Sequence, residues 1–123
     1  MKSFLGSTPL TPYTIVQFGA NDDTVVPCVA ATNASIGVVN ELGLTAADIA
    51  AGNTCDVYVG EIAEVVLGGT VAAGAMLTSN ATAQAVAAAP AAGTNNRIIG
   101  TALANGVSGD VIPVFINRSV MQG

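Results

Sequence analysis

Short runs of aliphatic and β-branched residues, separated by glycine and polar turn residues, dominate the hydrophobic pattern of the chain. Residues 24–30, 35–39, 97–103 and 111–116 form four such runs, and Asn105-Gly106 marks a turn between the last two. Runs of this kind bounded by turn signals are typical of β-strands. Residues 55–65 alternate polar and apolar positions with a period of two, although imperfectly, and give the strongest strand prediction.

The middle of the chain predicts further short strands and one short helix. Residues 65–67 and 72–78 are strand candidates on either side of a glycine turn. In the alanine-rich residues 81–92, alternating Thr, Gln and Val favour strand or irregular structure slightly over helix. Residues 44–52 change the period, since Thr45 with Asp48 resembles an N-cap pair and Gly52 a helix stop.

The first 20 residues have no clean helical or strand period. Prolines restrict the backbone there, and several apolar side chains are scattered between them. We therefore predict an extended N-terminal arm over residues 1–20, followed by a β-domain over residues 21–123. An arm with exposed apolar groups contacts a partner or frays, and the pattern fits both. The candidates for contact with a partner or a neighbouring subunit are Phe4, Leu5, Pro9, Leu10, Pro12 and Tyr13.

A weak internal echo supports the β prediction. Ile-Gly, Gly-polar and a three-residue strand pattern occur twice in the same order. The first set is Ile36-Gly37, Gly52-Asn53 and Val57-Tyr58-Val59, and the second is Ile99-Gly100, Gly109-Asp110 and Val114-Phe115-Ile116. Because glycine and valine are common in this chain, we use the echo only as support for strands. Short strands at close spacing predict an all-β fold, a small barrel or sandwich with at most one short helix.

The amino-acid composition indicates that the protein associates with other subunits. Hydrophobic residues make up 51% of the 123 residues, aromatic residues only 4% and charged residues 9%. The core must therefore consist of small aliphatic side chains, each of which buries little area. A weakly charged surface of small and polar residues often lies against other protein, so we expect neighbouring subunits to contribute to stability.

Charge and hydropathy disfavour nucleic acid and membrane as partners. The net charge is −5, and the three cations Lys2, Arg97 and Arg118 form no basic cluster in the sequence. No stretch of about 20 continuous apolar residues predicts a spanning helix. The first residues also lack the apolar block of a secretory signal, so we expect synthesis and assembly in the cytoplasm.

The side-chain chemistry gives no support to an enzyme. The chain has no histidine, no phosphate-binding glycine motif and no loop rich enough in carboxylates for calcium, so we predict no catalytic site, metal or cofactor. The close acidic pairs Asp22-Asp23 and Glu61 with Glu64 fit turns and solvated strand faces better than acid–base catalysis. Cys28 and Cys55 belong to no paired motif and are expected to be buried free thiols.

Five blocks in a fixed order resemble the bacteriophage capsid cement or head-decoration family. They are residues 36–39 (IGVV), 52–60 (GNTCDVYVG), 69–78 (GTVAAGAMLT), 99–103 (IGTAL) and 109–116 (GDVIPVFI). The resemblance covers residues from about 24 to 118, and it is their order rather than any single block that carries it. Ala75 and Pro113 depart from the family pattern.

The resemblance implies a small β-barrel or β-tulip-like domain, often a homotrimer. Such proteins bind the outer surface of an expanded phage head, contact the major capsid protein, bridge neighbouring capsomers and stabilise the shell. The expected location is the virion, and no catalytic residue is implied. A tail-tube or spike module, or a ligand-binding β module, are the alternatives, although stacking aromatics for a ligand are few.

Overall fold

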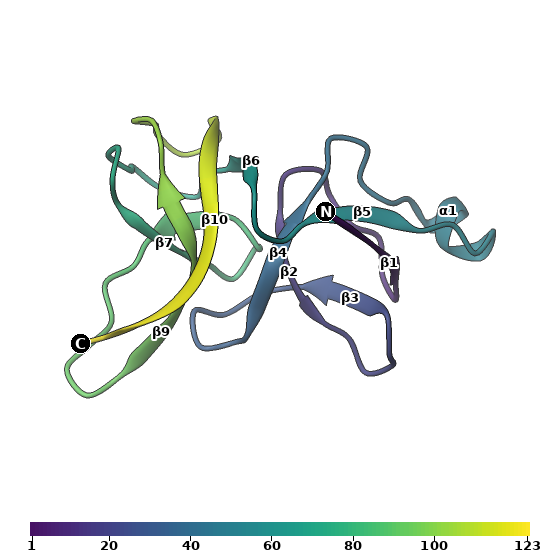
Figure 1. The fold of residues 1–123 in the computed structure, drawn as a ribbon, viewed down its shortest axis with the longest axis horizontal. Helices are drawn as coiled ribbons and strands as arrows, with labels where there is room; N and C mark the ends of the chain where they lie inside the picture. Colours follow the sequence, from purple (N-terminus) through teal and green to yellow (C-terminus); the bar gives the residue numbers. More distant parts are fainter.

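The computed structural model describes all residues 1–123, and nearly all its elements are strands (Figure 1). This confirms the all-β prediction with one short helix, α1 (Ala46–Ala50). The first five strands are β1 (Lys2–Gly6), β2 (Ile15–Phe18), β3 (Thr24–Pro27), β4 (Ser35–Val39) and β5 (Cys55–Tyr58). The last five are β6 (Ile62–Val66), β7 (Met76–Ser79), β8 (Ala85–Ala87), β9 (Asn95–Ala102) and β10 (Val111–Gln122).

The strands form two units with the same order. Strands β1–β5, here called unit 1 (residues 2–58), close into a barrel that runs β1-β5-β4-β2-β3 and returns to β1. Strands β6–β10, called unit 2 (residues 62–122), form a sheet in the order β6-β10-β9-β7-β8. When five is added to each strand number of unit 1, the strand order of unit 1 becomes the strand order of unit 2. The fold is therefore a tandem repeat, and Figure 1 shows the units side by side, joined once between β5 and β6.

The strand register makes the equivalence residue-specific. Val38 lies opposite Tyr58 in unit 1, and Thr101 lies opposite Phe115 in unit 2. The bridge Leu10–Leu44 likewise corresponds to Val71–Gly106. The echo in the sequence was thus a structural repeat, and equivalent residues are written below as pairs such as Tyr58/Phe115.

Each unit encloses equivalent apolar positions. The core of unit 1 contains residues from every strand of its barrel, and residues at the same positions belong to the core of unit 2. The pairs are Phe4/Val65, Leu10/Val71, Val16/Leu77, Val25/Ala85, Ile36/Ile99, Val39/Ala102, Cys55/Ile112, Val57/Val114 and Val59/Ile116. Aliphatic side chains make up most of both interiors, as the composition predicted, and Phe4 is the one aromatic residue among the buried residues.

The two units differ where β1 meets β3. In unit 1 the Leu5 N–H donates to the Asp23 carbonyl at 2.8 Å, next to the parallel pairing that closes the barrel. In unit 2 the equivalent groups are the Val66 N–H and the Ala83 carbonyl, and both bond to unit 1 instead. Only one parallel bridge, Leu67–Ala85, remains of the closure.

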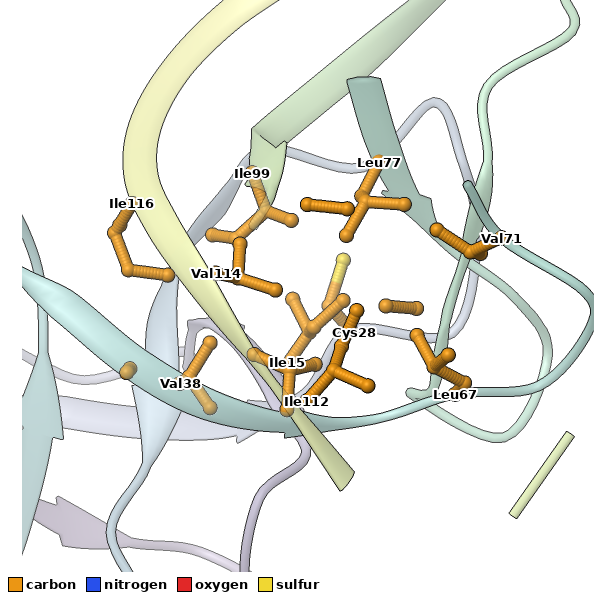
Figure 2. Close-up of a cluster of buried hydrophobic side chains, with 14 residues drawn as sticks. Ile15, Cys28, Val38, Leu67, Val71, Leu77, Ile99, Ile112, Val114 and Ile116 are labelled. Atoms are coloured by element: carbon orange, nitrogen blue, oxygen red, sulfur yellow. The ribbon is translucent and has the colours of Figure 1, made fainter. Parts of the chain in front are cut away.

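A segment of unit 1 occupies this opening in unit 2. The Tyr13 carbonyl accepts from the Val66 N–H at 3.0 Å, and the Ile15 N–H donates to the Ala83 carbonyl at 2.9 Å. Ile15 thereby reaches the core of unit 2 together with Cys28 and Val38, as Figure 2 shows. The inserted segment 13–15 explains why unit 2 is an open sheet while unit 1 is closed.

Two predictions from the sequence need correction. Residues 1–20 are not an extended arm, because β1 and β2 are barrel strands and Phe4, Leu10 and Ile15 are buried. Their spacing looked irregular because two short strands alternate separately, with the turn that contains Pro12 between them. The single strand predicted over residues 55–65 is split at Val59–Glu61, where the chain leaves unit 1 for unit 2.

The helix is an addition to unit 1. Its N-cap Thr45 forms the predicted capping box with Asp48, whose carboxylate accepts from the Thr45 N–H at 3.0 Å. Between Leu44/Gly106 and Gly52/Gly109, unit 1 contains residues 45–51 and unit 2 only residues 107–108. The repeat therefore folds without a helix in unit 2.

Candidate functional site

A pocket of about 320 Å³ lies where the two units meet. We call it the junction pocket, and it is lined by Tyr13, Glu41, Tyr58, Ile62, Ala63 and Glu64. Tyr13 belongs to the inserted segment, Glu41 follows β4, Tyr58 ends β5, and the other three belong to β6. The pocket thus exists only because unit 2 is held against unit 1.

Tyr13 has an unusual backbone conformation in this pocket. Its φ is +67°, in the left-handed region, whereas its partner in the repeat is Gly74 with φ +90°. A bulky residue in that region costs on the order of 1–2 kcal/mol relative to glycine. The repeat requires the positive φ but not the aromatic ring, because unit 2 has none at this position.

The pocket carries uncompensated negative charge. The chain contains two ion pairs, the N-terminal ammonium with Glu61 at 2.9 Å and Lys2 with Asp23 at 3.5 Å, so Glu41 and Glu64 are in neither. No lysine or arginine lines the pocket. Desolvation raises the pKa of Tyr58, and the nearby Glu41 carboxylate raises it further. Two phenols and two carboxylates that are in no ion pair therefore line one cavity.

A second candidate surface covers the outer side of the sheet in unit 2. We call it the apolar face, and it consists of the exposed residues Ile62, Met76, Leu103, Val111 and Phe115. One row crosses four strands, because Ile62 lies opposite Phe115, Phe115 opposite Thr101, and Thr101 opposite Met76. A contiguous exposed patch of this kind is typical of an interaction surface.

In unit 1, the part of the equivalent face that β2 and β4 form is covered. Ile15 and Val38 are the partners of Met76 and Thr101, and both are fully buried against unit 2, whereas Met76 is 38% exposed. The Ser79 hydroxyl also donates to the Cys28 carbonyl across this boundary. Within one chain, then, this part of the face is covered in unit 1 and open in unit 2.

The structure separates the six contact residues predicted from the sequence. Phe4 and Leu10 are 4% and 3% exposed and belong to the core of unit 1, so they cannot contact a partner in this state. Leu5 and Pro9 are exposed, and Pro12 and Tyr13 are half-buried. Tyr13 alone lies in the junction pocket, while Glu41, Tyr58 and Glu64 were not among the predicted contact residues.

The two cysteine thiols lie in the protein interior. Cys28 and Cys55 are free and buried, as predicted, and desolvation raises the pKa of both thiols. No three His, Cys, Asp or Glu side chains are placed to hold a metal ion. No helix has the length and hydrophobicity needed to cross a membrane.

Comparison with known proteins gives a match in structure and none in sequence. No protein-family model and no curated protein sequence matches the chain. The crystal structure of the N base of the head fiber gp8.5 in bacteriophage phi29 superposes with a TM-score of 0.55. The match covers 99% of this chain and 97% of that chain, at 15% sequence identity.

The chain has the fold of a phage head-fiber base. Since the match covers almost the full length of both chains, it includes unit 1 and unit 2 together. At 15% identity the likeness establishes the fold and not the binding partner. It agrees with the family resemblance noted from the sequence, which was also to proteins of the phage head.

Proposed function

We propose that the chain is a capsid decoration protein that binds the outer surface of a phage head. The observation that carries this proposal is the likeness of the whole chain to a head-fiber base. The amino-acid composition agrees with a structural role, because the chain is low in charge and lacks histidine. The proposed partner is the major capsid protein, and the proposed location is the outer surface of the virion.

The apolar face supports association with other protein. Five exposed apolar side chains on adjacent strands lose water-exposed area when another protein covers them, which is favourable at about 25 cal/mol per Å². We propose that this face contributes to self-association, with a homotrimer as the expected form. Leu5, Pro9, Pro12 and Tyr13, the accessible members of the six predicted residues, remain proposed contacts with the shell or a neighbouring subunit.

Stabilisation of the shell follows from repetition of weak contacts. A protein that binds the assembled head and not its separated subunits shifts the equilibrium toward the assembled form. When each copy bridges neighbouring capsomers, many modest contacts add to a large barrier against disruption. No catalytic step is part of this function.

The direct test uses heads that lack the protein. Purified chain is added to expanded heads, which are then imaged by electron microscopy and heated to measure their rupture temperature. We expect density at regular outer positions and a higher rupture temperature. Absence of binding to expanded heads would overturn the proposal.

Variants of the apolar face test the self-association component. We expect Phe115→Asp to lower the oligomer mass measured by light scattering, because it places a charge in the centre of the face. Leu42→Asp is the control, since Leu42 is exposed on the loop after β4 and lies outside this face. An unchanged mass for Phe115→Asp would exclude the face as an interface between copies.

A further inference from the structure

The tandem repeat acts as an internal control for the junction pocket. Three of its residues come from unit 1 positions that have counterparts in unit 2. Hydrogen bonding and register give Tyr13/Gly74 and Tyr58/Phe115, and Glu41 lies two residues after the pair Val39/Ala102, where unit 2 contains Ala104. Unit 2 builds the same strand order with glycine, alanine and phenylalanine there. The phenol ring of Tyr13, the carboxylate of Glu41 and the hydroxyl of Tyr58 are therefore not requirements of the fold.

The conformation of Tyr13 makes the same point independently. A tyrosine replaces the glycine that its positive φ favours, and it lines a pocket to which unit 1 contributes two phenols and a carboxylate and unit 2 a second carboxylate. Strained residues of this kind concentrate at binding sites, where the surrounding structure holds them in place. The ring of Tyr13 is half-buried rather than enclosed in a core, so packing alone does not account for it.

The chemistry of the lining selects a cation. Glu41 and Glu64 are exposed carboxylates without an ion-pair partner, and the cavity contains no basic group. The faces of tyrosine rings attract ammonium and guanidinium groups, and a carboxylate accepts hydrogen bonds from both. Ile62 provides an apolar wall for the methylene stem of a long basic side chain.

We propose that the junction pocket binds an arginine or lysine side chain of a partner protein. Under the proposed function, on which the identity of the partner rests, that side chain belongs to the outer surface of the shell protein. Tyr13 and Tyr58 contact the cation and its stem, and Glu41 and Glu64 neutralise its charge. The net charge of −5 on the whole chain would also attract a basic partner.

The first experiment measures binding of small probes to the full chain by amide chemical shifts in NMR. The probes are N-acetyl-arginine methylamide, the lysine equivalent, and N-acetyl-citrulline methylamide, a neutral analogue close in shape to arginine. We expect shifts at residues 13, 41, 58 and 62 with a dissociation constant in the millimolar range for the basic probes. The citrulline probe is expected to bind about tenfold more weakly.

Variants identify which groups in the pocket bind the probe. Glu41→Gln combined with Glu64→Gln should weaken arginine binding about tenfold, and Tyr13→Gly, which restores the residue of unit 2, about threefold to fivefold. Asp22→Asn is the matched control, because it removes a carboxylate of the same charge outside the pocket. Urea titration of each variant shows that the fold is retained.

Two results would overturn the assignment. Equal binding of the arginine and citrulline probes would show that charge is not recognised, and shifts produced by methyl glucoside but not by the arginine probe would identify a carbohydrate site instead. In the head-binding assay, normal binding by the Glu41→Gln, Glu64→Gln variant would show that the pocket does not take part in the contact with the shell. Failure of the unmodified chain to bind heads would instead overturn the proposed function.

Discussion

Unit 1 and unit 2 share one strand order and one register but close in different ways. Unit 1 joins β1 to β3 through Leu5 and Asp23 and fills its interior with its own side chains. Unit 2 contains the smaller Val65 and Ala85 where unit 1 contains Phe4 and Val25, and its core includes side chains from unit 1. A small repeat with few aromatic residues can thus complete its core with residues borrowed from its neighbour.

The same difference determines which surfaces remain available. Insertion of segment 13–15 covers the part of the outer face of unit 1 that β2 and β4 form, and it creates the junction pocket beside it. Nothing covers the equivalent face in unit 2, so Met76 and Phe115 are exposed. One packing event therefore produces both candidate surfaces, and a change that separates the units should affect both together.

The largest expected effect comes from the pair Gly37/Gly100, where both units have the same requirement. A Cβ at Gly37 would collide with the Tyr58 carbonyl, and one at Gly100 with the Phe115 carbonyl. We expect Gly37→Ala and Gly100→Ala each to lower the free energy of unfolding by more than about 3 kcal/mol, because neighbouring strand backbones must move apart. Urea titration followed by circular dichroism measures the loss.

Gly60→Ala is the control for this pair. No atom lies within 4 Å of a Cβ built at Gly60, and its φ is not positive, so we expect a change within about 0.5 kcal/mol. If either Gly37→Ala or Gly100→Ala were as mild as this control, the close approach would not be an essential feature of that unit.

The next effect distinguishes the units. Ile15 and Met76 are equivalent, but Ile15 is fully buried in the core of unit 2 and Met76 is on the apolar face. We expect Ile15→Ala to cost about 2–5 kcal/mol and Met76→Ala less than about 1 kcal/mol in the same urea titration. Similar losses of stability at the two positions would contradict the conclusion that Ile15 of unit 1 is part of the core of unit 2.

The sequence predicted the strands better than their division into units. The runs at 35–39, 97–103 and 111–116 overlap β4, β9 and β10, and Thr45 with Asp48 correctly marked the helix. The echo between the two halves of the sequence also reflects the repeat. Extending it backward with a two-residue gap aligns Leu10 with Val71 and places a strand before each, in place of the arm.

Most of the candidate site could not be predicted from the sequence. Tyr13 and Glu41 are far in the chain from each other and from Tyr58 and Glu64, and the four residues come together only because the barrel of unit 2 is open. That opening depends on which carbonyl the Val66 N–H reaches, Tyr13 or Ala83, and both offer the same chemistry. A local pattern of hydrophobic and polar residues does not predict which of the two carbonyls accepts this hydrogen bond.

A smaller effect is expected from the helix that only unit 1 possesses. Replacing residues 45–51 by Val-Ser, the sequence of the shorter connection at 107–108 in unit 2, removes α1, which has no fully buried residue. Only the partial packing of Ile49 against the core is lost, so we expect the free energy of unfolding to fall by about 1 kcal/mol. The β-strand signal in the circular dichroism spectrum should not change. Failure to fold would show that unit 1 depends on its helix in a way that unit 2 does not.

The smallest effect concerns the connection between the units and depends on pH. Glu61 accepts from the N-terminal ammonium and from the Val59 and Gly60 N–H groups, and these bonds, the ammonium first, hold its pKa below its ordinary value of 4.5. A carboxyl whose pKa is lower in the folded state stabilises the fold above pH 4.5, and the contribution disappears as the pH falls through the folded pKa. Glu61→Gln should therefore be slightly less stable than the unmodified chain at pH 7, and the two stabilities should converge in acid. The group is exposed, so the difference should be small and should shrink with added salt. A stability difference that persists unchanged at low pH would mean that Glu61 acts through packing and not through its charge.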